Sequence, residues 1–175
     1  MTVVAHSLGG LIALHLAAKN PGTVTRLVLF GPIEPPPEAG QKGLRARGKA
    51  VRDGGMGAVA DTVIGATLAA ATLQDHPEVT GFARELLSRQ QPEGYALACE
   101  AAAASAEPEY EKIKSLVTIV SGAEDRVSAP ATCESIANKL KSATVDIVSW
   151  DGVGHWHTLE NPKGGSALIR KILGF

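Results

Sequence analysis

Hydrophobic residues form several short continuous runs along this 175-residue chain. Residues 25–31, 116–122 and 144–150 are apolar runs rich in β-branched side chains, and a shorter run stands at residues 3–5. Runs of this length predict strands, and the first two of the three longer runs are typical of strands buried on both faces. We therefore predict a sheet with a largely apolar interior.

Helical repeats alternate with these predicted strands. Residues 8–19 are apolar nearly all round the helix, which predicts a helix buried on most sides, and an Asn-Pro-Gly triplet ends it. Residues 130–142 are amphipathic, and residues 161–175 predict a terminal helix. Strand–helix alternation indicates the α/β class, with a mostly parallel sheet, right-handed crossovers and flanking helices.

The segment from residue 32 to residue 108 interrupts this alternation. It opens on the Pro-rich stretch PIEPPPEAG and continues through Ala-rich helical stretches without a strand pattern. The helical stretches cover residues 43–55, 56–73, 76–90 and 92–107. We therefore predict a core made of residues 1–31 and 109–175, with residues 32–108 inserted as a helical cap or lid.

The net charge and the composition of the chain limit the classes of binding partner that we expect. The net charge of −1 gives no electrostatic reason to expect nucleic acid or an anionic membrane. A basic cluster lacks interleaved aromatic residues, so we interpret it as the solvated face of a helix. This cluster consists of Lys42, Arg45, Arg47, Lys49 and Arg52.

The cysteines and the apolar stretches indicate the cellular compartment in which we expect the protein. Cys99 and Cys133 are widely separated and have neither CxxC nor Cys/His spacing, so they predict two reduced thiols rather than a disulfide or a zinc site. The opening residues lack the basic region of a signal peptide, and no apolar stretch reaches the roughly 20 residues of a membrane span. We expect a cytoplasmic protein that does not bind membranes.

Ser7 stands where the first predicted strand meets the first predicted helix, in the sequence AHSLGG. A sharp strand-to-helix turn needs small residues two positions either side of such a serine, and Ala5 and Gly9 meet this need. The usual pattern is G-x-S-x-G, so Ala5 is a mild departure. The turn exposes the hydroxyl of Ser7 as a nucleophile and points the N–H of Leu8 at a developing oxyanion.

A serine nucleophile needs an imidazole base and a carboxylate that orients it, in the chain order Ser, Asp or Glu, His. Asp125 follows the strand at 116–122, and His155 follows the strand at 144–150 in a Gly-rich loop. Carboxyl ends of parallel strands share one edge of a sheet, so we predict that Ser7, Asp125 and His155 form a catalytic triad.

Residues close to the predicted triad in the sequence are alternative candidates for its carboxylate and its imidazole. Glu124 and Asp151 compete with Asp125, and His157 is the rival of His155. We expect His6 and Trp156 to line the substrate pocket. His15 lies farther along the helix and is interpreted as a packing residue.

Three segments of the chain together resemble the α/β-hydrolase superfamily. They are VVAHSLGG, SGAEDRVSAP and DGVGHWHTLENP. Two further segments, RGKAVRDGGMGAVADTVI and PEGYALACEAAAA, resemble the cap of 3-oxoadipate enol-lactonases and of their esterase and perhydrolase-like relatives. The resemblance implies a serine hydrolase that cleaves carboxylic esters or lactones of small molecules through an acyl-serine intermediate. It implies no metal and no organic cofactor.

The resemblance runs from Val3 to the C-terminus, whereas the family's fold has strands, helices and a His-Gly loop before the turn that carries the nucleophilic serine. We therefore expect an N-terminally truncated, partial α/β-hydrolase fold with impaired activity and self-association through an exposed sheet edge. The cap lacks the large aromatic residues that enol-lactonases carry after their VADTV-like stretch, which leaves the lactone substrate open. The alternative is a non-catalytic fragment of the same fold, either a small-ligand binder or a truncated product.

Overall fold

A computed structural model describes residues 1–174 of the chain. Four strands, nine α-helices and one short 3-10 helix occur in these residues. In chain order the elements are β1 (Thr2–His6), α1 (Leu8–Lys19), β2 (Arg26–Phe30), α2 (Glu38–Gly54), α3 (Gly57–Thr67), α4 (Ala70–Asp75), α5 (Pro77–Ser88), α6 (Pro92–Ala103), η1 (Tyr110–Lys112), β3 (Leu116–Gly122), α7 (Pro130–Lys139), β4 (Thr144–Trp150), α8 (His157–Glu160) and α9 (Pro162–Leu173).

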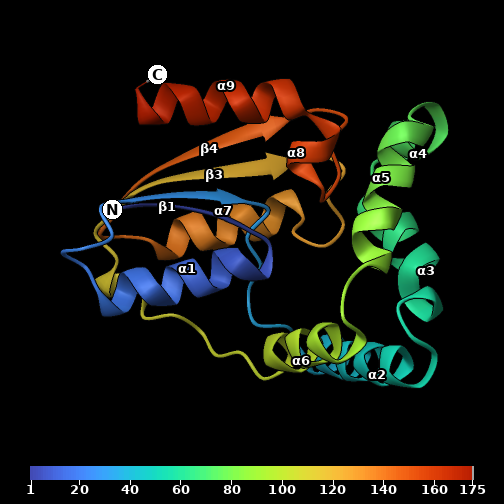
Figure 1. Cartoon of the computed structure of the whole chain (residues 1–175). Coiled ribbons are helices and arrows are strands. Elements are labelled where there is room, and N and C mark those ends of the chain that lie inside the picture. Colours follow the sequence, from blue (N-terminus) through green and yellow to red (C-terminus); the bar gives the residue numbers. More distant parts are fainter. Residues whose placement is uncertain (175) are drawn as a thin grey trace.

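The strands form one parallel sheet in the order β1-β2-β3-β4, which confirms the predicted α/β class. The pairing keeps one register across the sheet, since Thr2 is opposite Arg26, Arg26 opposite Leu116, and Leu116 opposite Thr144. All carboxyl ends of the strands therefore point the same way (Figure 1). Among the described residues, β1 and β4 are the edges of the sheet.

Helices cover both faces of the sheet (Figure 1). The main core lies on one face, where α1 and α7 pack on the strands through fully buried residues such as Leu14, Leu27 and Ile136. On the other face, Phe30 and Val120 are packed against apolar residues of α9. Because β2 is buried on both faces, its sequence is a continuous apolar run rather than an alternating one.

Proline defines where several helices begin. Pro77, Pro92, Pro130 and Pro162 are the first residues of α5, α6, α7 and α9. The fixed φ of proline suits this position, and its missing N–H would have no intrahelical acceptor there. The predicted strands at 116–122 and 144–150 match β3 and β4 residue for residue.

The helices between β2 and β3 gather beyond the carboxyl ends of the strands, where we refer to α2–α6 as the helical segment (Figure 1). The segment has its own apolar clusters, one around Val51 and Val59 and another around Ile64 and Leu68. Partly buried Trp156, from the loop after β4, packs against both clusters. The apolar contacts of this residue therefore join the helical segment to the core.

One predicted helical stretch is interrupted. Residues 56–73 were expected to be continuous, but Leu68 and Ala69 adopt extended backbone and separate α3 from α4. The break is stabilised from outside the segment, because the carboxylate of Glu160 accepts the N–H of Ala69 at 2.8 Å and Arg126 donates to the carbonyl of Leu68 at 2.9 Å. Groups bound to distant side chains do not need helical partners.

The expectation that α1 is buried on most sides is wrong for one stripe. Leu11, Leu14 and Ala18 are buried, but Ile12 is 61% exposed and Leu16 is 40% exposed. Within residues 1–174, none of the helices combines the length and the apolar character that a bilayer crossing demands.

Candidate active site

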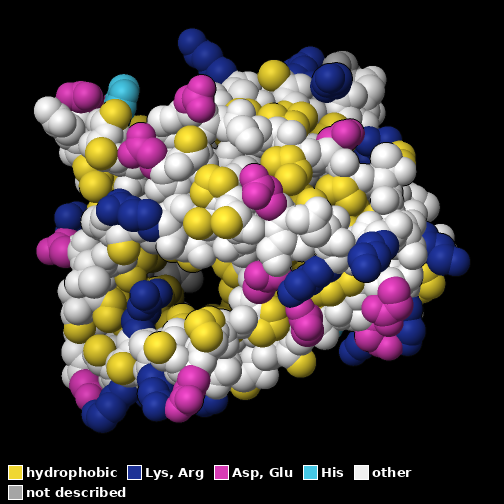
Figure 2. Space-filling view, turned by 180° about the vertical axis from the view of Figure 1, so that it is seen from behind, with side chains coloured by type: hydrophobic (Ala, Val, Ile, Leu, Met, Phe, Trp, Pro, Cys, Tyr) yellow, Lys and Arg dark blue, Asp and Glu magenta, His cyan; other side chains and the backbone are white. Residues whose placement is uncertain are grey.

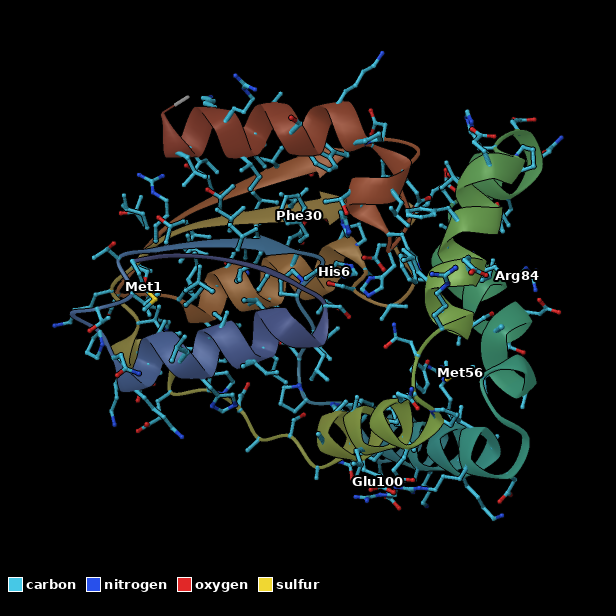
Figure 3. The ribbon with its side chains drawn as sticks, in the orientation of Figure 1. Met1, His6, Phe30, Met56, Arg84 and Glu100 are labelled. Carbon is cyan, nitrogen blue, oxygen red and sulfur yellow. The ribbon has the colours of Figure 1, made fainter. Side chains whose placement is uncertain are left out.

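Three loops at one edge of the sheet carry the residues singled out from the sequence. Ser7 follows β1, Asp125 lies just beyond β3, and His155 lies five residues beyond β4. The strands are parallel, so these loops meet at the edge that faces the helical segment. Figure 3 shows His6, the last residue of β1, at this edge.

Ser7 has a strained backbone. Its φ of 54° and ψ of −122° lie outside the usual regions, and among the described residues it is the sole non-glycine with positive φ. Such a conformation costs about 1–3 kcal/mol and persists only where the surroundings impose it. One constraint is the N–H of Ser7, which donates to the carbonyl of Phe30 on β2 at 3.0 Å.

The two glycines after Ser7 are unequal in importance. A Cβ on Gly10 would lie 2.9 Å from Cβ of Pro32, closer than side chains tolerate, so α1 can pass Pro32 only with glycine there. A Cβ on Gly9 would meet Cβ of Ala5 at an ordinary 3.8 Å. The close approach of α1 to a neighbouring segment therefore depends on Gly10 rather than on Gly9.

Ser7, His155 and Asp125 form a continuous hydrogen-bonded chain. Nδ1 of His155 lies 2.8 Å from Oδ2 of Asp125, and Nε2 of His155 lies 2.8 Å from Oγ of Ser7. An ionised carboxylate only accepts hydrogen bonds, so Nδ1 of His155 carries the proton. Nε2 is then free to accept the hydroxyl proton of Ser7, as a general base requires.

The environment of Asp125 keeps it ionised. Burial acts to raise the pKa of this carboxyl, but hydrogen bonds from His155 and from the backbone N–H groups of Ser128 and Val127 outweigh it and lower the pKa. The two backbone groups donate to Oδ1 at 2.8 Å each, which leaves Oδ2 to His155. Asp125 can therefore orient and stabilise a charged imidazole.

His6 and His157 both bind the main chain of His155. Nε2 of His6 lies 2.7 Å, and Nδ1 of His157 lies 2.9 Å, from the carbonyl oxygen of His155. A carbonyl only accepts, so both nitrogens are donors and the tautomers of both rings follow. His157, the rival considered from the sequence, is 1% exposed, and the imidazole that reaches Ser7 is that of His155.

The helical segment is bonded directly to the loop that carries His155. The N–H of His155 donates to the carbonyl of Thr67 at 2.6 Å, and Nε1 of Trp156 donates to Oγ1 of Thr67 at 2.8 Å. A Cβ on Gly154 would lie 2.5 Å from the same carbonyl, so only glycine allows this contact.

Sequence reasoning missed Thr67, Arg126 and Glu160. No local pattern identifies them, because each is separated by more than 50 residues from a group that it binds across this junction.

A cavity of about 520 Å³ opens at Ser7. Its volume falls in the range of small-molecule sites, about 300–1,000 Å³. Figure 2 shows a hollow edged by hydrophobic side chains and by a Lys or Arg side chain. The residues lining the cavity include His6, Ser7, Leu8, Glu34, Leu44, Arg47, Val63, Thr67, Tyr95, Cys99, His155 and Trp156.

All five residues of the basic cluster are exposed, as expected for a solvated helix face. Arg47 lines the cavity, and the guanidinium of Arg52 binds Glu93 at 2.8 Å and Glu100 at 2.5 Å on α6. Lys42 and Lys49 make exposed pairs within α2, as a solvated face would. The interpretation as a solvated face therefore holds for the exposure of all five residues, and the structure adds the contacts that Arg47 and Arg52 make.

Comparison with known proteins shows which family the chain matches. A family model described as serine aminopeptidase, S33, matches residues 1–162. A curated relative, 3-oxoadipate enol-lactonase 2 of Acinetobacter baylyi, is 24% identical over 168 residues, which are 95% of this chain and 61% of the relative.

Solved structures share the fold. A thermophilic esterase of Thermogutta terrifontis, solved with malate bound, superposes with a TM-score of 0.87 at 24% identity, over 99% of this chain and 64% of the esterase. The enol-lactonase of Burkholderia xenovorans LB400 gives 0.84 at 24% identity, over 98% and 65%. The chain thus spans less than two thirds of the length of these relatives.

Proposed function

Because the chain belongs to the serine aminopeptidase S33 family and has the α/β-hydrolase fold, we propose that it hydrolyses carboxylic esters or lactones with Ser7, His155 and Asp125. The observation that carries the proposal is the hydrogen-bonded chain from Asp125 through His155 to Ser7 at the mouth of a cavity. The names of the relatives, an enol-lactonase and an esterase, favour the ester or lactone bond over the peptide bond.

The first half of the reaction forms an acyl-serine. Oγ of Ser7 attacks the carbonyl carbon while Nε2 of His155 takes the hydroxyl proton, and the carboxylate of Asp125 stabilises the resulting imidazolium. The N–H of Leu8, at the first position of α1, donates to the oxyanion. Collapse of the tetrahedral intermediate breaks the bond to the alkoxy oxygen, which takes its proton from His155.

The second half returns the enzyme to its starting state. Water attacks the acyl carbon, His155 takes a proton from that water, and Oγ of Ser7 leaves with the proton from His155. The products are a carboxylic acid and an alcohol, or a single hydroxy acid from a lactone. Every proton moves through Nε2 of His155, which the bond from Nδ1 to Asp125 keeps in the right tautomer.

We assign the role of a cap to residues 32–108, which are held against the catalytic loop through Thr67 and line the cavity through Arg47, Tyr95 and Cys99. In this role the segment selects the substrate. We also propose that the protein works in a reducing compartment such as the cytoplasm, since Cys99 and Cys133 are both buried and unpaired.

The function is tested with a fluorophosphonate probe and p-nitrophenyl acetate. The wild-type protein should react with the probe and hydrolyse the ester, and Ser7→Ala should abolish both. Ser88→Ala, at an exposed serine at the end of α5, is the matched control and should behave as wild type. His155→Ala should reduce labelling far more than His157→Ala.

Three outcomes would contradict the proposal. Labelling that survives Ser7→Ala would place the nucleophile elsewhere, and a wild-type protein that binds esters without turning them over would favour a non-catalytic binder. Turnover of an aminoacyl p-nitroanilide faster than of esters would indicate a peptidase instead.

A further inference from the structure

The helical segment is interrupted between α3 and α4, and we refer to residues 65–70 at this point as the junction. The last carbonyl groups of a helix have no partner within the helix. Here the carbonyl of Thr67 accepts the N–H of His155 at 2.6 Å. The guanidinium of Arg126 donates to the carbonyl of Leu68 at 2.9 Å. The loops after β3 and β4 therefore bind groups that the interruption leaves free.

The junction binds the residues on both sides of Asp125 in the sequence. The N–H of Ala70, at the start of α4, has no acceptor within its own helix and donates to the carboxylate of Glu124 at 2.9 Å. Glu124 precedes Asp125, and Arg126 follows it. One short piece of backbone thus binds the two neighbours of Asp125 and the main chain of His155, so it fixes the two loops relative to each other.

Two glycines allow the loop of His155 to fit between the junction and β3. A Cβ on Gly154 would lie 2.5 Å from the carbonyl oxygen of Thr67. A Cβ on Gly122, at the end of β3, would lie 2.5 Å from the carbonyl oxygen of Val153. Both distances are shorter than a side chain tolerates, so the loop has direct backbone contact on both sides. His155 can therefore move away from β3 only if the junction moves as well.

The side chain of Thr67 adds a second bond to the same loop. Its Oγ1 accepts Nε1 of Trp156 at 2.8 Å and donates to the carbonyl of Val63 at 2.8 Å. Thr67 is 8% exposed and lines the cavity, but its hydroxyl proton is already donated within the protein. The hydroxyl therefore holds Trp156, the residue next to His155, rather than offering a donor to a substrate.

We propose that Thr67 is a positioning residue, which through its bonds to residues 155 and 156 keeps the imidazole of His155 within reach of Ser7. The helical segment then sets the rate of the reaction for every substrate, including one too small to contact the segment. Displacement of a base by about 1 Å can lower a rate about 100-fold, so a modest shift of this loop is sufficient. The inference rests on the proposed hydrolase function and adds positioning of the base to the selection of substrate.

Steady-state kinetics with p-nitrophenyl acetate, a substrate with a two-carbon acyl group, test the inference. Thr67→Val keeps the shape of the side chain and removes the acceptor of Trp156, so kcat should fall about tenfold while KM stays within about twofold of wild type. Thr67→Ser keeps the hydroxyl and should retain most of kcat. Thr62→Val, at an exposed threonine of the same helix outside the cavity lining, is the matched control and should behave as wild type.

A double-mutant cycle tests whether the effect passes through Trp156. Trp156→Phe removes the other partner of the same bond and should lower kcat by a similar factor. The double variant Thr67→Val/Trp156→Phe should lose no more than about the larger single loss, because both substitutions break one bond. If Thr67→Val does not fold, Trp156→Phe tests the same bond alone.

Three kinetic results would overturn the inference. The first is a wild-type kcat in Thr67→Val or Trp156→Phe. The second is a change in KM without a change in kcat, which would make Thr67 a substrate contact. The third is full multiplication of the two losses in the double variant, which would show that the residues act independently.

Hydrogen exchange separates this inference from the proposed reaction. The backbone N–H of His155 is bonded to the carbonyl of Thr67, so its exchange rate, followed by NMR, reports how firmly the junction holds the loop. Exchange should be about tenfold faster in Thr67→Val than in wild type and unchanged in Thr62→Val. Equal exchange in Thr67→Val and wild type would overturn the role of Thr67 even in an active hydrolase. Faster exchange in Thr67→Val, with no turnover by wild type, would retain that role and reject the reaction.

Discussion

Nε2 of His157 lies 3.9 Å from Oδ2 of Asp125 and has no hydrogen-bond partner, although both side chains are buried. Nδ1 of His157 donates to the carbonyl of His155, so in the neutral ring Nε2 is an unprotonated acceptor that faces a carboxylate. A proton on Nε2 would turn this ring toward Asp125 as a second donor, in competition with His155. We therefore expect the hydrogen-bonded chain from Ser7 through His155 to Asp125 to depend on a neutral His157.

Burial lowers the pKa of His157 below its ordinary value of 6.5. Below pH 6.5 the unfolded chain binds a proton that the folded chain resists, so the free energy of unfolding should fall as the pH drops. Asp125 acts in the same direction at lower pH, because its lowered pKa gives stability that is lost below about pH 3.8. We expect His157→Asn to flatten the loss between pH 6.5 and 5, measured by urea unfolding.

The asparagine amide can still donate to the carbonyl of His155, so the variant removes the titration and keeps the donor. His76→Asn, at an exposed histidine, is the control and should retain the wild-type slope. The same slope in His157→Asn and wild type would show that another group causes the acid sensitivity.

His6 is the second donor to the carbonyl of His155. Its loss should loosen the loop and lengthen the contact from His155 to Ser7, so we expect His6→Ala to lower kcat about tenfold, in line with one lost hydrogen bond in a site that needs exact geometry. His15 lies on α1, and His15→Ala, which removes an exposed hydrogen bond to the carbonyl of Ala106, serves as the control. Steady-state kinetics with p-nitrophenyl acetate decide the matter: a His6 variant with wild-type kcat would contradict a positioning role.

Gly31 has a φ of 48°, and a Cβ there would lie 2.6 Å from Cε1 of His157 and 2.8 Å from Oδ2 of Asp125. Gly31→Ala should therefore displace the two side chains as well as strain the backbone. Gly55, with a φ of 69° and no atom within 4 Å of such a Cβ, separates the effects.

We expect Gly55→Ala to cost about 1–2 kcal/mol of stability from backbone strain alone. Gly31→Ala should cost more and also abolish labelling of Ser7 by the fluorophosphonate. Thermal unfolding and probe labelling measure the two effects. Equal stability of the two variants, with labelling intact, would show that the site tolerates the extra methyl group.

Glu160 binds the helical segment to the core through three donors. Its carboxylate accepts the N–H of Ala69 at 2.8 Å, the hydroxyl of Thr72 at 2.9 Å and the N–H of Trp156 at 3.0 Å. Glu160→Ala should lower the free energy of unfolding by about 2 kcal/mol, because the donors lose a charged acceptor. Glu85→Ala, which removes a surface pair with Arg89, should have little effect. Denaturant unfolding that ranks these two variants equally would reject the anchoring role.

Self-association through β1 remains a prediction. β1 is an edge strand among the described residues, and Val4 on it is 48% exposed, while Ile12 on α1 is 61% exposed. Unpaired strand edges and apolar patches favour association. We expect the molar mass from light scattering to rise with concentration and Val4→Lys to reduce this rise. Lys141→Ala, at an exposed lysine after α7, is the control, and a monomer at every concentration would contradict the prediction.

The sequence by itself determined the strands of the sheet, the order along the chain of the loops that carry Ser7, Asp125 and His155, and the position of the strand-to-helix turn at Ser7. A strand buried on both faces must be apolar throughout, so β2 and β3 are visible as continuous runs. The turn at Ser7 must have small neighbours, so Ala5 and Gly9 mark it. These are requirements on residues within a few positions of one another, which is why a local pattern records them.

Only the tertiary structure decided which histidine reaches Ser7 and which arginine faces the cavity. His155 and His157 are two residues apart in one loop, and their different partners depend on where Thr67 and Asp125 lie. Arg47 of α2 lines the cavity together with Tyr95 of α6. Contacts between residues dozens of positions apart leave no periodic signal in the sequence. Each of the two segments in contact can form its own helix or strand without them.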